Sequence, residues 1–206
     1  MQALAWIVAV AGAYLVGSVS FAVVISRLFG LADPRSYGSG NPGATNVLRS
    51  GSKGAAALTL AGDAAKGAVA VWLVRAFGPQ FGVGELGVAL AALAAFVGHL
   101  YPVFFGFKGG KGVATFLGAL LALNFGAGLL ACGAWLAVAA IFRYSSLASL
   151  CSAVAAPAAL LWLTGAPARS LVIAAMSVLL IARHRQNIAN LLAGRERRIG
   201  EKSARG

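Results

Sequence analysis

The sequence predicts an all-α, polytopic membrane protein, a single bundle of seven transmembrane helices. Of its 206 residues, 60% are hydrophobic and only 11% are charged, whereas soluble domains contain about 25% charged residues. The apolar residues form long runs separated by short connections, and the basic residues gather on one set of these connections. No linker or internal repeat divides the chain, so residues 1–206 are expected to form one domain.

Apolar runs of about 17 to 25 residues predict helices that cross the roughly 30 Å apolar core of a bilayer. The first run has no early Lys or Arg and no clean A-x-A cleavage region, so it is expected to be a retained span rather than a signal peptide. A long loop, 30–53, separates it from the rest. The predicted spans are 4–28, 54–76, 85–106, 112–125, 128–142, 146–164 and 169–183.

The run between Lys111 and Arg143 is too long for one span and short for two. As one helix, residues 112–142 would extend about 46 Å at about 1.5 Å per residue, well beyond an apolar core of roughly 30 Å. The stretch Asn124-Phe125-Gly126-Ala127-Gly128 weakens a helix interior, because glycine and asparagine are poor helix formers. Two short, tightly joined helices are therefore predicted.

With two helices in that run, the most basic connections all fall on one side of the membrane. These are 30–53, 107–111, 143–145 and the C-terminal tail. Fourteen of the 17 Lys and Arg residues lie on them or at the adjoining span ends, and the other three are Arg75, Arg169 and Lys66. By the positive-inside rule this side is cytoplasmic, with the N-terminus outside and the C-terminus inside. Topology thus explains most of the net charge of +12, and no nucleic-acid partner is expected.

The loop 30–53 contains GSGNPG, which matches the dinucleotide-binding pattern G-x-G-x-x-G. That pattern requires a preceding strand and a later acidic residue within a βαβ unit. Here a membrane helix precedes it, and Asp63 falls inside a span, so dinucleotide binding is disfavoured. Polar side chains in a glycine-rich loop favour ligand binding over a simple turn; the candidates are Ser39, Gly40, Asn41, Thr45, Asn46 and Arg49.

The stretch GFKGGKGVATFLG, residues 106–118, is a second glycine-rich loop. It is not a Walker A loop, because Phe105 stands where glycine is required and Gly112 replaces Ser or Thr. A glycine-rich turn before a helix N-terminus, with a lysine, is still typical of phosphate binding. Ordinary positive-inside lysines are the alternative. The candidates are Lys108, Gly109, Gly110, Lys111, Gly112 and Thr115.

Two further polar stretches lie at predicted membrane edges. FRYSSLASL, 142–150, contains Arg143, Ser146 and Ser149, and taken alone its hydroxyls suggest only helix packing. ARHRQNIANLLAGRERR, 182–198, places His184 and Asn187 three residues apart, on one helical face. Whether this histidine is structural or catalytic stays open.

Asp63 and Lys66 lie three residues apart within the second predicted span. Ionisable groups at membrane depth are costly and face the bundle interior. An internal pair that neutralises itself explains both side chains without a role in catalysis. If the pair lies beside a polar site, it would also order that site.

Together these motifs resemble those of the bacterial acyl-phosphate:glycerol-3-phosphate acyltransferases, over nearly the whole chain. The similar stretches are GSVSFAVVISRL, GSGNPGATNVLR, GDAAKG, GHLYPVFFGFKGGKGVAT, RYSSLAS and RHRQNIANLLAGRE. The resemblance implies acyl transfer from acyl phosphate to the sn-1 hydroxyl of glycerol 3-phosphate, giving lysophosphatidic acid and inorganic phosphate. This is the first acylation of phospholipid biosynthesis, at the cytoplasmic face of the bacterial cell membrane.

The resemblance also implies roles for individual residues. Its first motif implicates Asn41 and Asn46 beside the catalytic candidates Ser39 and Arg49. Its second motif assigns the loop around Gly109, Gly110, Lys111 and Gly112 to glycerol-phosphate binding, with Lys111 among the catalytic candidates. Its third motif implicates His184 and Asn187, and suggests that Glu196 is structural. In the serine-rich stretch either Ser146 or Ser149 corresponds to a substrate contact.

Other classes fit less well. A transporter of an organic phosphate is the main alternative, but secondary transporters generally use inverted repeats and a site near the midplane. Asp33 and Asp63 are the only aspartates, which disfavours an enzyme that holds divalent metal with an aspartate cluster. No metal or cofactor is expected. The oligomeric state stays open, and a monomer is compatible with the sequence.

Overall fold

The structure, a computed structural model, describes residues 1–201. Over that range it contains only helices, turns and loops, so the all-α prediction is confirmed there. Lys202 and Arg205, two of the basic residues that the sequence assigns to the cytoplasmic side, lie outside the described residues. The α-helices are α1 (Gln2–Gly17), α2 (Phe21–Leu28), α3 (Ala44–Leu48), α4 (Lys53–Phe77), α5 (Glu85–Leu100), α6 (Val113–Leu123), α7 (Phe125–Phe142), α8 (Ser145–Thr164), α9 (Pro167–Arg183) and α10 (Arg185–Leu192).

Five segments within residues 1–201 are long and apolar enough to cross a membrane: Gln2–Leu28, Lys53–Phe77, Glu85–Phe105, Phe125–Phe142 and Ser145–Thr164. A sixth is added if α9 and α10, which bend by 59° at their junction, count as one span. The remaining predicted span, 112–125, corresponds to α6. Its 11 residues extend about 16 Å at about 1.5 Å per residue, roughly half the apolar core.

The first predicted span, 4–28, is not a continuous helix. α1 ends at Gly17 and α2 begins at Phe21. At the end of α1 the hydroxyl of Ser18 donates to the carbonyl of Tyr14 at 2.9 Å, and the ammonium of Lys66 donates to the carbonyl of Val19 at 2.6 Å. Hydrophobicity alone does not reveal such a break, because the backbone carbonyls that it frees accept hydrogen bonds from side chains of this protein and need no water.

The predicted break in 112–142 is present, but it lies at Asn124 rather than at the glycines that follow. The Asn124 side chain accepts a hydrogen bond from the backbone N–H of Ala127 at 2.8 Å and so caps α7. Asparagine is among the best N-cap residues, because its side-chain oxygen satisfies a free N–H of the first turn. Gly126 and Gly128 therefore lie within α7 instead of ending a helix.

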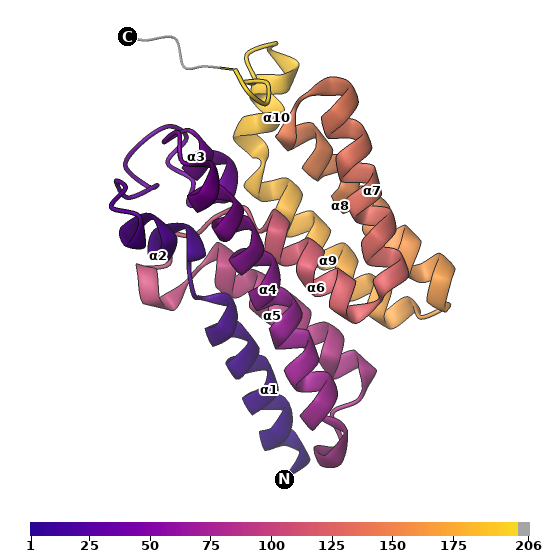
Figure 1. Ribbon diagram of the computed structural model, residues 1–206. Helices are drawn as coiled ribbons and strands as arrows, with labels where there is room; N and C mark the ends of the chain where they lie inside the picture. The colour runs from indigo at the N-terminus through magenta and orange to yellow at the C-terminus, as the bar shows by residue number, and fades with distance from the viewer. Residues whose placement is uncertain (202–206) are drawn as a thin grey trace.

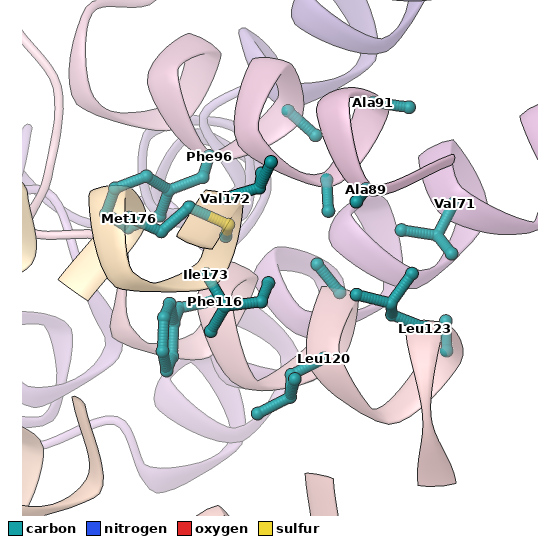
Figure 2. Packing of buried hydrophobic residues seen from close by; sticks show 14 of the residues in the cluster. Val71, Ala89, Ala91, Phe96, Phe116, Leu120, Leu123, Val172, Ile173 and Met176 are labelled. Atoms are coloured by element: carbon teal, nitrogen blue, oxygen red, sulfur yellow. The ribbon is translucent and has the colours of Figure 1, made fainter. Parts of the chain in front are cut away.

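Closely packed helices surround the core. A Cβ atom on Gly118 of α6 would lie 2.1 Å from the carbonyl oxygen of Ala64, so α4 and α6 touch backbone to backbone there. Side chains of α4, α5, α6 and α9 fill the centre (Figure 2). Phe96 and Phe116 meet edge to face, with ring centroids 6.1 Å apart, a geometry that aromatic pairs favour.

The two ends of the bundle differ. In Figure 1 the N-terminus lies at one end, and α3 and α10 lie at the opposite end. Near the N-terminal end, Glu85 binds two arginines, Arg169 at 2.8 Å and Arg75 at 3.7 Å. The sequence places these two arginines on the side opposite the other basic residues. Most of the predicted site residues belong to the segments around α3 and α10.

Candidate active site

The first loop is ordered around the buried amide of Asn46, in α3. Its Oδ1 accepts hydrogen bonds from the backbone N–H and the hydroxyl of Ser39, at 3.0 and 3.2 Å. Its Nδ2 donates to the carbonyls of Pro34 at 2.7 Å and Tyr37 at 3.1 Å. Arg49 approaches the same Oδ1 at 3.4 Å. Asn46 therefore fixes the loop that presents the exposed side chains of Ser39 and Arg49.

The second loop packs against the end of α5 through its glycines. The N–H of Gly110 donates to the carbonyl of His99 at 3.2 Å. A Cβ atom on Gly109 would lie 2.1 Å from that carbonyl oxygen, and one on Gly110 would lie 2.9 Å from the carbonyl oxygen of Pro42. The second loop thus lies between the end of α5 and the first loop, at a distance that only glycine permits.

Arg183, the last residue of α9, donates hydrogen bonds to backbone carbonyls of the same loop. Its Nη2 donates to Gly109 at 3.0 Å and to Gly110 at 3.1 Å, and its guanidinium lies over the ring of Tyr101. The backbone N–H groups of Lys111 and Gly112 donate to no acceptor within residues 1–201. Free N–H groups before a helix N-terminus are the arrangement that binds phosphate.

A chain of side-chain hydrogen bonds joins this loop to the last two polar stretches. The Lys111 ammonium donates to Oδ1 of Asn187. Nδ2 of Asn187 donates to Oε1 of Glu196 at 2.7 Å, and the hydroxyl of Ser146 donates to the same oxygen at 2.6 Å. Residues from the second loop, α8, α10 and the segment that follows α10 therefore meet at one place.

Cations outnumber carboxylates at this place. Burial lowers the pKa of the Lys111 ammonium, the Glu196 carboxylate opposes that shift, and the charges of Arg49 and Arg183 add to it. One carboxylate thus faces three cationic side chains. Such a surplus of positive charge, next to free backbone N–H groups, favours binding of an anion.

His184 is buried beside these residues, at the junction of α9 and α10. Burial, with smaller contributions from the Lys111 and Arg183 charges, lowers its pKa to about 4, against the opposing effects of the Leu180 carbonyl and the Glu196 carboxylate. The ring is therefore neutral at pH 7. Nδ1 lies 2.8 Å from that carbonyl oxygen, which only accepts, so Nδ1 carries the proton and Nε2 is left as an acceptor.

Comparison with known proteins identifies the family. The sequence model of the family described as glycerol-3-phosphate acyltransferase matches residues 7–194. The chain belongs to the glycerol-3-phosphate acyltransferase family. The family resemblance predicted from the motifs is thereby confirmed.

Similar members of the glycerol-3-phosphate acyltransferase family cover the chain almost completely. The glycerol-3-phosphate acyltransferase of Ralstonia nicotianae is 64% identical over 96% of this chain and 96% of its own. That of Herminiimonas arsenicoxydans is 64% identical over 93% of each.

Two crystal structures of PlsY (YgiH), described as an integral membrane glycerol 3-phosphate acyltransferase, are also similar. The glycerol 3-phosphate form superposes with a TM-score of 0.87 at 40% identity, covering 95% of this chain and 96% of that chain. The lysophosphatidic acid form gives a TM-score of 0.84 at the same identity, covering 95% of each. With its own apolar helices, this acyltransferase-family chain is a multi-pass integral membrane protein.

Some predicted site residues of this acyltransferase-family chain lie outside the hydrogen-bonded group. Thr45 and Lys108 are exposed, and neither side chain forms a hydrogen bond or ion pair within residues 1–201. Arg143 binds the C-terminal segment, donating to the carbonyl of Ile199 at 2.9 Å. Ser149 donates to the carbonyl of Ser145 and accepts from Trp135 of α7.

The two serines that the sequence leaves open therefore differ in surroundings. Ser146 reaches the Glu196 carboxylate, whereas both contacts of Ser149 serve helix packing. Thr115 is buried one turn into α6, below the loop. Among the candidates in the serine-rich stretch, Ser146 is the one that joins the site.

Arg183 is the site residue that sequence reasoning treats only as a positive-inside charge. Its position directly before His184 is the available signal, because a helix that carries His184 into the site carries its neighbour to the same edge. What the sequence does not reveal is its partner. Arg183 donates to the backbone carbonyls of Gly109 and Gly110, and every residue has a backbone carbonyl, so the sequence gives no sign of this contact.

The low pKa of His184 predicts how stability depends on pH. In the unfolded chain its pKa is near 6.5, so between about pH 6.5 and 4 the unfolded state binds the proton and the folded state does not. Folding free energy is therefore lost as the pH falls through this window, by about 2 kcal/mol at pH 5. Thermal unfolding in detergent at pH 7.5 and 5 should show a smaller acid-induced loss for His184→Gln, which does not titrate. An equal loss in both proteins would contradict the assignment.

Proposed function

We propose that this protein transfers an acyl group from acyl phosphate to the sn-1 hydroxyl of glycerol 3-phosphate. The hydroxyl oxygen forms a bond to the acyl carbonyl carbon, and the bond from that carbon to the phosphate oxygen breaks. The proton of the hydroxyl moves to a phosphate oxygen of the donor, which leaves as inorganic phosphate. The lipid product is 1-acyl-glycerol 3-phosphate, lysophosphatidic acid.

The observation that carries this proposal is the joining of the glycine-rich loop to the Lys111, Asn187, Glu196 and Ser146 chain. The donor is a mixed anhydride that is already activated, so the enzyme needs no covalent intermediate. Its tasks are to hold two phosphates beside a carbonyl and to stabilise charge. A site rich in cations and N–H donors, in a chain with five acidic residues, suits these tasks.

Individual roles follow from this arrangement. Lys111 and Arg49 hold phosphate groups, together with the free N–H groups of the second loop. Ser39, His184 and Asn187 position the reacting groups, with the unprotonated Nε2 of His184 available to accept a hydrogen bond from the sn-1 hydroxyl. The acyl chain lies between helices, in apolar surroundings equivalent to those of the bilayer.

We further propose that the chain crosses the bacterial cytoplasmic membrane seven times, with the site on the cytoplasmic side. The gathering of basic residues on the segments around α3 and α10 supports this orientation. Because α6 alone is too short for a span, the second loop lies partway into the membrane thickness in this arrangement. The topology is tested in a protein whose Cys132 and Cys151 are replaced by alanine. Lys53→Cys and Gln80→Cys are introduced one at a time, and each is labelled from either side of sealed vesicles.

Donor choice is the prediction that tests the function. Purified protein is given glycerol 3-phosphate with acyl phosphate, acyl-CoA or acyl-acyl carrier protein in parallel, and lipid product is separated by chromatography. Only acyl phosphate is expected to yield lysophosphatidic acid, because the site presents cations to the donor phosphate; any rate with the thioesters should be at least about a hundredfold lower.

Three outcomes would contradict the proposal. Equal use of acyl-CoA would exclude recognition of the donor phosphate. A trapped acyl-enzyme would exclude direct transfer. Uptake of glycerol 3-phosphate into liposomes, without any acyl transfer, would favour the transporter alternative.

A further inference from the structure

A second polar cluster lies directly next to the glycine-rich loop, inside the helix bundle. It consists of Asp63 and Lys66 in α4, His99 in α5 and Thr115 in α6, with exposed fractions of 2%, 4%, 7% and 0%. From the sequence, Asp63 and Lys66 are predicted to form an internal pair, which would order a polar site if it lay beside one. The proposed reaction uses none of the four residues. Their contacts extend well beyond a pair.

The cluster is centred on the Asp63 carboxylate. Its Oδ1 lies 2.8 Å from the ammonium of Lys66 and 3.5 Å from Nδ1 of His99. The backbone carbonyl of Asp63 accepts a hydrogen bond from the hydroxyl of Thr115 at 2.9 Å, and that hydroxyl oxygen lies 3.2 Å from the same Nδ1. Three helices, α4, α5 and α6, are therefore joined through a few polar atoms.

These contacts fix the orientation of the His99 ring. The single hydroxyl proton of Thr115 is donated to the Asp63 carbonyl, so its oxygen accepts from His99. The Asp63 carboxylate also only accepts. Nδ1 of His99 therefore carries a proton and faces the cluster, and the opposite edge of the ring, with Nε2, faces away from it.

That opposite edge lies against the glycine-rich loop. A Cβ atom on Gly110 would lie 2.3 Å from Nε2 of His99. The backbone of His99 holds the loop as well, because its carbonyl accepts from the N–H of Gly110. The side chain and the backbone of His99 thus both contact the loop. The Arg183 guanidinium also holds it, by donating to the carbonyls of Gly109 and Gly110.

The other arm of the cluster reaches the break between α1 and α2. The Lys66 ammonium, besides pairing with Asp63, donates to the carbonyl of Val19 at 2.6 Å. This break redirects the chain into α2 and the first loop. The cluster therefore contacts the segments that lead into both glycine-rich loops.

We propose that Asp63, Lys66, His99 and Thr115 form a positioning network that sets the glycine-rich loop for phosphate binding. A pair that only had to neutralise charge would need neither His99 nor Thr115. Ion pairs and hydrogen bonds between buried polar groups hold their elements rigidly, because each lost partner leaves an unsatisfied group in an apolar interior. The effect on substrate affinity rests on the proposed function; the effect on the loop does not.

The test removes one hydroxyl without changing side-chain shape. Thr115→Val should raise the KM for glycerol 3-phosphate about five- to tenfold, the equivalent of one lost buried hydrogen bond, with kcat within about twofold. Thr115→Ser keeps the hydroxyl and should restore the wild-type KM. Ser177→Ala is the matched control, because it removes a buried hydroxyl that binds only the carbonyls of Ala153 and Ile173; its KM should not change.

A second pair of variants separates the two edges of the ring. In His99→Asn the side-chain amide replaces Nδ1 and leaves the Gly110 side empty, so KM should rise as in Thr115→Val. In the double variant Asp63→Asn/Lys66→Met no unpaired buried charge remains, so the protein should stay folded while its KM is raised. An unchanged KM in Thr115→Val and His99→Asn, with folded protein, would overturn the network and leave only a neutralising pair.

Amide hydrogen exchange of residues 106–112, measured without substrate, separates this proposal from the function. Thr115→Val should speed exchange in this segment, and Ser177→Ala should not. If wild-type protein transfers no acyl group yet the exchange difference appears, the function is wrong and the network is upheld. If acyl transfer occurs and neither exchange nor KM differs between the variants, the network is wrong and the function is upheld.

Discussion

Lys111→Met is expected to lower kcat/KM for glycerol 3-phosphate by about a hundredfold to a thousandfold, equivalent to roughly 2.7 to 4 kcal/mol of transition-state stabilisation. The loss has two parts. A charge that holds phosphate disappears, and Oδ1 of Asn187 loses the hydrogen bond that the Lys111 ammonium donates to it. Because Asn187 also binds Glu196, the orientation of its amide is expected to change with it. Steady-state kinetics of the reconstituted protein measure the effect.

The matched control for this lysine stands three residues earlier. Lys108 belongs to the same loop and carries the same charge, but it is exposed and forms no side-chain hydrogen bond or ion pair within residues 1–201. Lys108→Met should change kcat/KM less than about threefold, since exposed charges contribute little. If both variants lose activity equally, only the overall positive charge of the loop matters, and the specific role of Lys111 is wrong.

The sequence predicts the helical class and most helix positions because long apolar runs have no other way to satisfy their backbone in a membrane. It fails where side chains end a helix early. The break at Ser18 to Ser20 lies in an apolar run. The carbonyl of Val19 within it accepts from the ammonium of Lys66, 47 residues later in the chain. The second break, between α6 and α7, is predicted correctly from the sequence, and only its exact position differs, because Asn124 caps α7.

The candidate site is predictable in its residue types and less so in its connections. Glycine-rich loops and a surplus of cations indicate phosphate from the sequence alone. Which serine faces the site depends on where Glu196 comes to lie, and this follows from the fold of the C-terminal segment. The contribution of Arg183 is hidden for another reason, because it binds backbone carbonyls that any residue possesses.

Gly109→Ala is expected to lower kcat/KM for glycerol 3-phosphate by about a hundredfold through the addition of one methyl group. A Cβ atom there would lie 2.1 Å from the carbonyl oxygen of His99 and 2.5 Å from that of Leu100, and both carbonyls belong to the end of α5. Backbone does not yield as a flexible side chain does, so the loop itself must move by about 1 Å or more. A displacement of that size in a binding loop costs about a hundredfold in rate.

The same displacement carries Lys111 away from Asn187 and pulls the loop carbonyls from Arg183, so affinity and turnover should fall together. Gly133→Ala is the matched control, because a Cβ atom at that position in α7 meets nothing within 4 Å and alanine favours the helix. Kinetics and thermal unfolding are measured for both variants. Gly109→Ala that is folded and fully active would mean that the loop does not hold the phosphate, and the site would have to be sought elsewhere at that end of the bundle.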